Sequence, residues 1–161
     1  MVNKKLMITK SSGFSLVELL VVVAIVGILS AVGTISYQGY VKSAKRSSAQ
    51  NIVQQTALAQ TEEYSNSGSY IVNEALADGA TLDDLNDADC RADSGSSNIL
   101  ERDLFSGDDI ITNKIGFEIC VIGNSATYKV IAKEVTNRQP LTYSGCEISL
   151  IRNSLPIKTD C

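Results

Sequence analysis

Apolar residues form one unbroken run near the start of the chain. From Phe14 to Ile35 nearly every residue is apolar or small, and Glu18 carries the only charge. As a helix this run would be ~33 Å long, enough to cross the hydrocarbon core of a bilayer. It is longer than the apolar core of a secretory signal peptide, and no matching cleavage site follows it. The pattern predicts a basic leader at residues 1–13 and a membrane-spanning helix at residues 14–36.

The helical pattern continues beyond the membrane span. Residues 41–63 contain no Pro or Gly and many Ala and Gln, which favours helix. "SNSGS" at residues 65–69 ends the pattern, with Gly68 as a left-handed cap. We therefore expect one helix from Phe14 to Asn66, with an amphipathic second half over residues 37–67. Its predicted apolar stripe consists of Tyr37, Tyr40, Val41, Ala44, Ile52 and Ala59.

An acidic segment follows at residues 68–112. Between Glu74 and Asp109 eleven Asp or Glu residues stand against two Arg, a local net charge of −9. The stretch "LDDLNDADC" has carboxylates that suit calcium, but it lacks the ligand spacing and the glycine of a calcium loop. The segment is interpreted as an irregular, solvated loop without a metal site.

Three strand-like runs occupy residues 113–161. They are "IGFEICVI" (115–122), "TYKVIAKEV" (127–135) and "CEISLIR" (146–152), with a loop "TNRQPLTYSG" before the third. Apolar and polar residues alternate along them, which predicts an antiparallel meander with one buried face. Covered by the amphipathic half of the helix, this meander gives an α+β fold: a helical stem packed on a small sheet.

The four cysteines lie in the part of the chain that would be exported. Lys4, Lys5 and Lys10 precede the apolar run and should stay in the cytoplasm, which places the rest outside. An even number of cysteines in an oxidising compartment predicts two disulfides. Metal ligation is disfavoured because the spacings are wide and the chain has no histidine.

The leader and the apolar run together resemble a known signal. "MVNKKLMITKSSG" followed by "FSLVELLVVVAIVGILSAV" is similar to the prepilin signal of type IV pilins. The similarity continues through "SYQGYVKSAKRSSAQ" and "EEYSNSGSY", which resemble the stems of type IVa major and minor pilins. It implies that a prepilin peptidase cuts after Gly13 and that the new amino terminus, Phe14, is N-methylated. It also implies that Glu18 lies near the amino terminus of a neighbouring subunit in a helical filament.

Physical chemistry supports this role of Glu18. A lone carboxylate in hydrocarbon is costly, whereas one paired with an ammonium group is much less so. A glutamate that snorkels to the membrane edge, or that is protonated in the bilayer, remains an alternative. One departure from the family concerns residue 35, where many type IVa pilins have proline and this chain has Ile35. Proline breaks helical hydrogen bonding, so its absence bears on whether the stem melts during assembly.

The disulfide pairing has three possible solutions. "SGCEISL" followed by Cys161 resembles the carboxy-terminal disulfide loop of the family. We expect Cys146–Cys161, which restrains the chain end, and Cys90–Cys120, which ties the acidic segment to a strand. Cys120 lies on the strand face opposite Phe117, within reach of a covering loop. Pairing of Cys120 with either later cysteine is the alternative.

The resemblance implies a structural subunit of an extracellular type IV pilus. The subunit would be stored in the inner membrane and polymerised by the pilus assembly machinery, in a fibre used for adhesion, motility or DNA uptake. The alternatives are a pseudopilin of a type II secretion system and a minor pilin that acts as a receptor. DNA is disfavoured as a direct ligand because the basic residues beyond the leader number eleven against eighteen acidic ones. No motif predicts an enzyme or a cofactor.

Overall fold

The computed structural model describes the chain apart from residues 1–12, 78, 80, 82, 85–89 and 112–114. The predicted leader therefore lies outside the described residues, except for Gly13. The chain divides into two compact units, Met1–Val41 and Lys42–Cys161, which are considered separately. All the strands among the described residues lie in the second unit.

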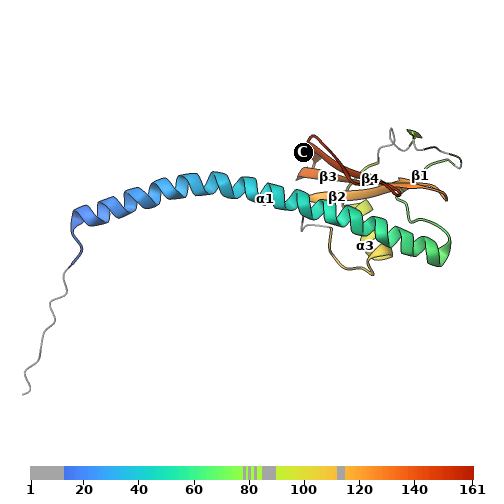
Figure 1. Ribbon diagram of the computed structural model, residues 1–161, viewed down its shortest axis with the longest axis horizontal. Coiled ribbons are helices and arrows are strands. Elements are labelled where there is room, and N and C mark those ends of the chain that lie inside the picture. The colour runs from blue at the N-terminus through green and yellow to red at the C-terminus, as the bar shows by residue number, and fades with distance from the viewer. Residues whose placement is uncertain (1–12, 78, 80, 82, 85–89, 112–114) are drawn as a thin grey trace, which may run out of the picture. The chain divides into compact units, whose positions relative to one another are not determined.

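One helix, α1, covers Leu16–Ser67 (Figure 1). It ends where Gly68 adopts a left-handed conformation with φ of 77°. The Gly68 N–H donates to the carbonyl of Tyr64 at 2.9 Å, and glycine adopts this conformation without the steric penalty of a Cβ atom. The predicted helix and its glycine stop are confirmed, with each end shifted by at most two residues.

The buried face of α1 in the second unit differs from the predicted stripe. It consists of Ala49, Val53, Thr56 and Gln60. Ala44 is exposed, and Ile52 and Ala59 lie half-buried at the edge. The predicted face is thus rotated by roughly one residue, or ~100°. The reason is that two polar side chains are buried with their hydrogen bonds satisfied, so hydropathy alone misplaced the stripe.

The sheet has five strands whose spatial order follows the chain. They are β1 (Glu74–Ala75), β2 (Phe117–Gly123), β3 (Tyr128–Arg138), β4 (Leu141–Ile151) and β5 (Ile157–Thr159). β2 to β5 form an antiparallel meander, while β1 pairs in parallel with the end of β2. The α+β fold predicted from the sequence, a long helix packed on a small antiparallel sheet, is confirmed.

The predicted loop "TNRQPLTYSG" is wrong. β3 continues to Arg138, the chain turns at Gln139 and Pro140, and β4 begins at Leu141. Only two residues form the turn, and the flanking Thr, Leu and Tyr suit strands. β1 and β5 were not predicted, because two or three residues are too few to show alternation.

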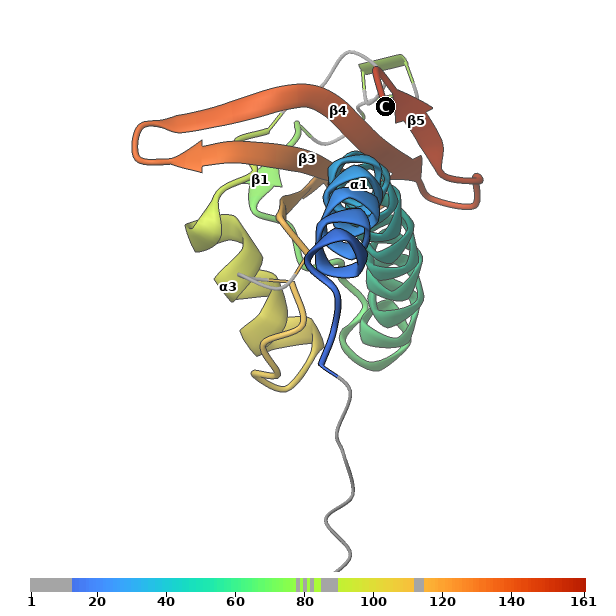
Figure 2. The ribbon, with the colours of Figure 1, turned by 90° about the vertical axis from the view of Figure 1, so that its left-hand side faces the viewer.

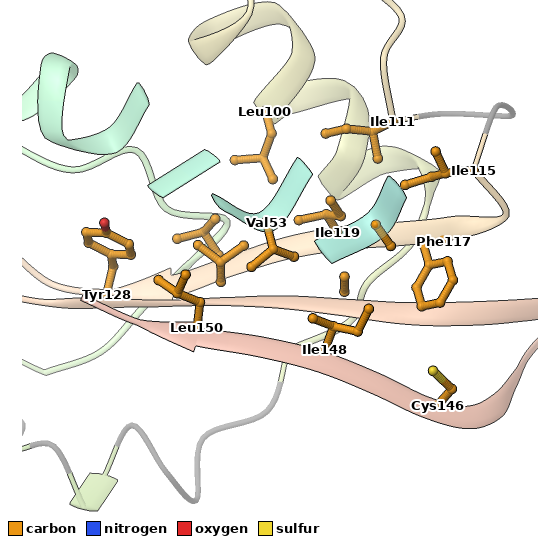
Figure 3. Packing of buried hydrophobic residues seen from close by; sticks show 14 of the residues in the cluster. Val53, Leu100, Ile111, Ile115, Phe117, Ile119, Tyr128, Cys146, Ile148 and Leu150 are labelled. Atoms are coloured by element: carbon orange, nitrogen blue, oxygen red, sulfur yellow. The ribbon is translucent and has the colours of Figure 1, made fainter. Parts of the chain in front are cut away.

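The second unit has an apolar core on each face of the sheet. α1 and a second helix, α3 (Ser94–Leu104), cover the same face (Figure 2). There, Val53 of α1 lies between Leu100 of α3 and Leu150 of β4 (Figure 3). A smaller cluster on the opposite face contains Cys90, Ala92, Cys120, Ile122 and Ile131. The sheet is therefore buried on both faces. The face opposite α1 is covered by the segment that precedes α3.

Helix α3 corrects the expectation of an irregular segment at residues 68–112. Asp93 caps its start: the carboxylate accepts from the Ser96 N–H at 2.9 Å, while the Ser96 hydroxyl accepts from the Asp93 N–H. Ser96 and Ser97 then bind the backbone of β2 at Ile119, where β1 does not reach. Ser96 and Ser97 thus satisfy the open edge of a strand.

A buried ion pair lies on β2 and β3. The Glu118 carboxylate is 1% exposed and lies 2.6 Å from the Arg138 guanidinium. It also accepts a hydrogen bond from the Ser97 hydroxyl at 2.6 Å. A buried carboxylate is tolerated when it is paired and hydrogen-bonded in this way. Glu118 therefore links α3 to two strands of the sheet.

Candidate assembly site

The beginning of α1 brings Glu18 close to the chain segment that precedes the helix. Gly13, Phe14 and Ser15 are not helical and are exposed, and α1 starts at Leu16. The Ser15 N–H donates to a Glu18 carboxylate oxygen at 3.1 Å, and the Ser15 carbonyl accepts from the Leu19 N–H at 3.1 Å. This is one half of a capping box.

The cap gives Glu18 a local role that the sequence analysis did not identify. A negative charge in the first turn interacts favourably with the positive end of the helix dipole. The signal was present in the sequence as Ser15-Leu16-Val17-Glu18, a serine with glutamate three residues later. Ser15 is therefore a residue of the site that was missed.

The apolar run of α1 is covered by nothing in its own unit. Every residue from Gly13 to Tyr40 is exposed, and the Phe14 side chain is 83% exposed. By length and composition this helix can cross a membrane. The hydroxyls of Ser30 and Thr34 donate to carbonyls one turn earlier, so these side chains need no outside partner. The surface suits an apolar environment such as lipid.

The helix is continuous through the position at which many type IVa pilins have proline. Ile35 lies within α1, as do Gly27, Gly33 and Gly39. Ile35 retains the amide hydrogen that proline lacks, so regular helical bonding is available there. Glycine weakens a helix interior by roughly 0.5–1 kcal/mol relative to alanine. The three glycines are thus the weakest points of an otherwise regular helix.

The second unit holds α1 to the sheet with a polar cluster near Arg46. The Arg46 guanidinium contacts the Glu134 carboxylate at 3.3 Å and donates to the carbonyl of Cys161. The Ser144 hydroxyl donates to Glu134 at 2.7 Å. Burial opposes the charged form of Glu134, but Ser144, Arg46 and nearby Lys42 outweigh it and hold its pKa below the usual value.

The four cysteines form two disulfides in the structure. Cys90 bonds to Cys120, and Cys146 bonds to Cys161, which is the expected pairing. The first links the segment before α3 to β2 on the face away from α1. The second closes a loop from β4 to the residue that Arg46 contacts. Both therefore fasten segments outside the meander to the sheet.

Within the described part of the chain, no group of three or more acidic or cysteine side chains could hold a metal ion. Most of "LDDLNDADC" lies outside that part; Asp83, Asp84 and Cys90 are described. The Asp84 carboxylate accepts from the Thr81 N–H and hydroxyl, which lower its pKa. Its local bonding resembles a helix start.

Comparison with known proteins bears on the same part of the chain. The family model of the prokaryotic N-terminal methylation motif matches residues 8–34. These residues include Gly13, Phe14 and Glu18. Over somewhat less than half of its length, this chain is also similar to fimbrial proteins and type IV major pilins.

Three relatives illustrate the extent of the similarity to type IV pilins. A fimbrial protein of Neisseria meningitidis is 40% identical over 77 residues, 48% of this chain and 45% of the relative. A type IV major pilin protein PilE1 of Neisseria gonorrhoeae is 42% identical over 69 residues, 43% of this chain and 42% of the relative. Fimbrial protein EcpC of Eikenella corrodens is 40% identical over 65 residues, 40% of this chain and 42% of the relative.

The matched region spans less than half the length of these pilins. No solved structure matches the chain. The family model covers only the beginning of α1 and the residues just before it, and it does not reach the sheet or the two disulfides.

Proposed function

We propose that this chain is a structural subunit of an extracellular type IV pilus. The observation that carries the proposal is the exposed apolar helix with a single charge, Glu18, within the region that matches the methylation motif. Such a surface is not stable in water, and it needs lipid before assembly and other helices afterwards. The inner membrane stores the subunit, and the pilus carries it to the cell surface.

Processing begins at the boundary between leader and helix. Prepilin peptidase cleaves between Gly13 and Phe14, and the new amino terminus is methylated. In support, both residues are exposed and non-helical, and no other described residue beyond the chain neighbours comes within 4 Å of the Cβ position of Gly13. An exposed peptide bond outside regular structure is one that a peptidase can reach.

Glu18 then sets the register of the filament. Its carboxylate pairs with the amino terminus of Phe14 in a neighbouring subunit, where the surrounding apolar helices make an unpaired charge costly. One oxygen already accepts from Ser15, and a carboxylate accepts several hydrogen bonds at once. The cap and the pairing are therefore compatible. In this role the chain is a building block and not an enzyme, and it needs no cofactor.

Intact-mass measurement of subunits from purified filaments tests the proposal. The expected mass corresponds to a chain that begins at Phe14 with one added methyl group. A mature chain that retains the residues before Phe14 would contradict the pilin assignment.

A further inference from the structure

Basic residues cluster on α1 just beyond its apolar run. Between Glu18 and Glu62 the helix has no acidic residue, and its only charges are Lys42, Lys45 and Arg46. The three follow the apolar run and precede Ala49, the first residue of the buried face of α1. Their spacing of three to four residues places them along one side of the helix. This concentration of positive charge contrasts with the acidic segment of the second unit.

One of the three is engaged within the protein. Arg46 contacts Glu134 and the carbonyl of Cys161, and 19% of its side chain is exposed. Glu134 also interacts electrostatically with Lys42. The net charge of Lys42, Lys45, Arg46 and Glu134 together is +2. Lys42 and Lys45 are both exposed, and the Lys45 side chain passes close to Gly116.

The position along the helix corresponds to the surface of a bilayer. Lys42 follows Ile35 by seven residues, ~10 Å of helix, whereas the polar layer on each side of the hydrocarbon core is ~5–8 Å thick. The Lys42 backbone therefore lies just beyond this layer, and its long side chain can extend back to the headgroups. Tyr37 and Tyr40 lie between Ile35 and Lys42 and are 69% and 73% exposed. Tyrosine is enriched at this depth because its ring is apolar and its hydroxyl polar.

We propose that Lys42 and Lys45 bind the phosphate groups of anionic lipids at the outer surface of the membrane that stores the subunit. Ammonium groups at that depth attract anionic headgroups, and this attraction is local, since the chain as a whole is acidic. The contact fixes how deep α1 sits, and it must break when the subunit leaves for the filament. The inference rests on membrane storage in the proposed function.

Fluorescent labels on the full-length chain test this inference. The natural cysteines are paired, so Ser43→Cys provides a single reactive thiol beside the lysines, and Ser30→Cys provides one within the apolar run. Each labelled protein is reconstituted into vesicles of phosphatidylcholine alone or with phosphatidylglycerol. We expect the emission of the Ser43 label to shift to the blue with phosphatidylglycerol, and salt to reverse the shift by screening.

Two double variants separate the lysines from net charge. Lys42→Gln with Lys45→Gln should abolish the lipid-dependent shift at position 43. Arg91→Gln with Arg102→Gln removes the same charge from side chains that are 73% and 70% exposed, and it should leave the shift intact. A shift that survives the lysine substitutions, or that is absent from the start, overturns the inference.

The Ser30 label distinguishes this failure from failure of the proposed function. One outcome is that the emission of the Ser30 label reports an apolar environment in both vesicle types while that of the Ser43 label does not change with phosphatidylglycerol. In that case the subunit is stored in the membrane, and only the proposed binding of lipid phosphate by Lys42 and Lys45 is wrong. If the Ser30 label remains in water in both vesicle types, membrane storage is wrong and the inference falls with it.

Discussion

Gln60, near the end of α1, binds both backbone polar groups of Ile71, three residues after the left-handed Gly68. Its side-chain carbonyl accepts from the Ile71 N–H at 2.9 Å, and its amide donates to the Ile71 carbonyl. The Gln60 side chain is fully buried. The pair therefore satisfies a stretch of backbone that leaves the helix and has no strand partner at this point.

Replacing Gln60 should destabilise the second unit. Gln60→Leu removes the partners of the N–H and carbonyl of Ile71, which is half-buried. A fully buried unsatisfied group costs about 1–3 kcal/mol, so the loss for each group here should be at the low end of this range or below it. Chemical denaturation of the protein in detergent measures the change in free energy of unfolding. Gln55→Leu is the matched control, because Gln55 is exposed on the same helix. Equal stability of the two variants would show that the Gln60 bonds contribute nothing.

The same residue shows why the sequence predicted the helix but misplaced its buried face. Length, composition and the glycine stop are local properties, so α1 followed from them. The buried face depends on what α1 meets, and Gln60 is buried because Ile71 returns to it. No hydropathy pattern encodes that contact. Ser97 on α3 is a similar case, since its burial depends on the open edge of β2 at Ile119.

For the candidate assembly site, the sequence indicated some residues but not the long-range contacts nearby. Gly13, Phe14 and Glu18 were inferred from a local motif, and that inference used no long-range contact. Ser15 could have been found from the Ser-x-x-Glu spacing but was not. The links from Arg46 to Glu134 and Cys161 join residues far apart in the chain, so no local pattern could have predicted them.

The carboxyl group of Glu134 should titrate below the usual range of glutamate. Because its pKa is lowered in the folded state, the charged form stabilises the fold above the unfolded pKa. This stability is lost as the pH falls through the folded pKa. NMR titration of the side-chain carboxyl should show the low value, and Arg46→Gln should raise it. An unchanged pKa in that variant would remove Arg46 as a cause.

The Cys90–Cys120 disulfide should be needed to hold the segment before α3 on the sheet. Replacing both residues with alanine removes a link that closes 30 residues of chain. Loop-closure entropy assigns such a link ~3–4 kcal/mol. Denaturation should detect this loss, and exchange of the Ala92 amide should accelerate. Non-reducing peptide mapping of the natural chain checks the pairing itself: a peptide that joins Cys120 to Cys146 or Cys161 would contradict it.

Filament assembly by Glu18→Ala tests the central claim most directly. Membrane insertion should be unchanged or improved, because the substitution removes the one charge from the apolar run. Assembly should fail or fall severely, because the Phe14 ammonium of each neighbour loses its partner in an apolar environment. Ser15→Pro removes the N–H that donates to the Glu18 carboxylate at the start of α1, but it keeps the carboxylate. This variant therefore separates the capping of the helix from the pairing of Glu18 with a neighbour's Phe14. The measurement is the number of filaments per cell at equal subunit abundance in the membrane. The account predicts few or none for Glu18→Ala, whereas filament numbers equal to those of the natural chain would contradict it.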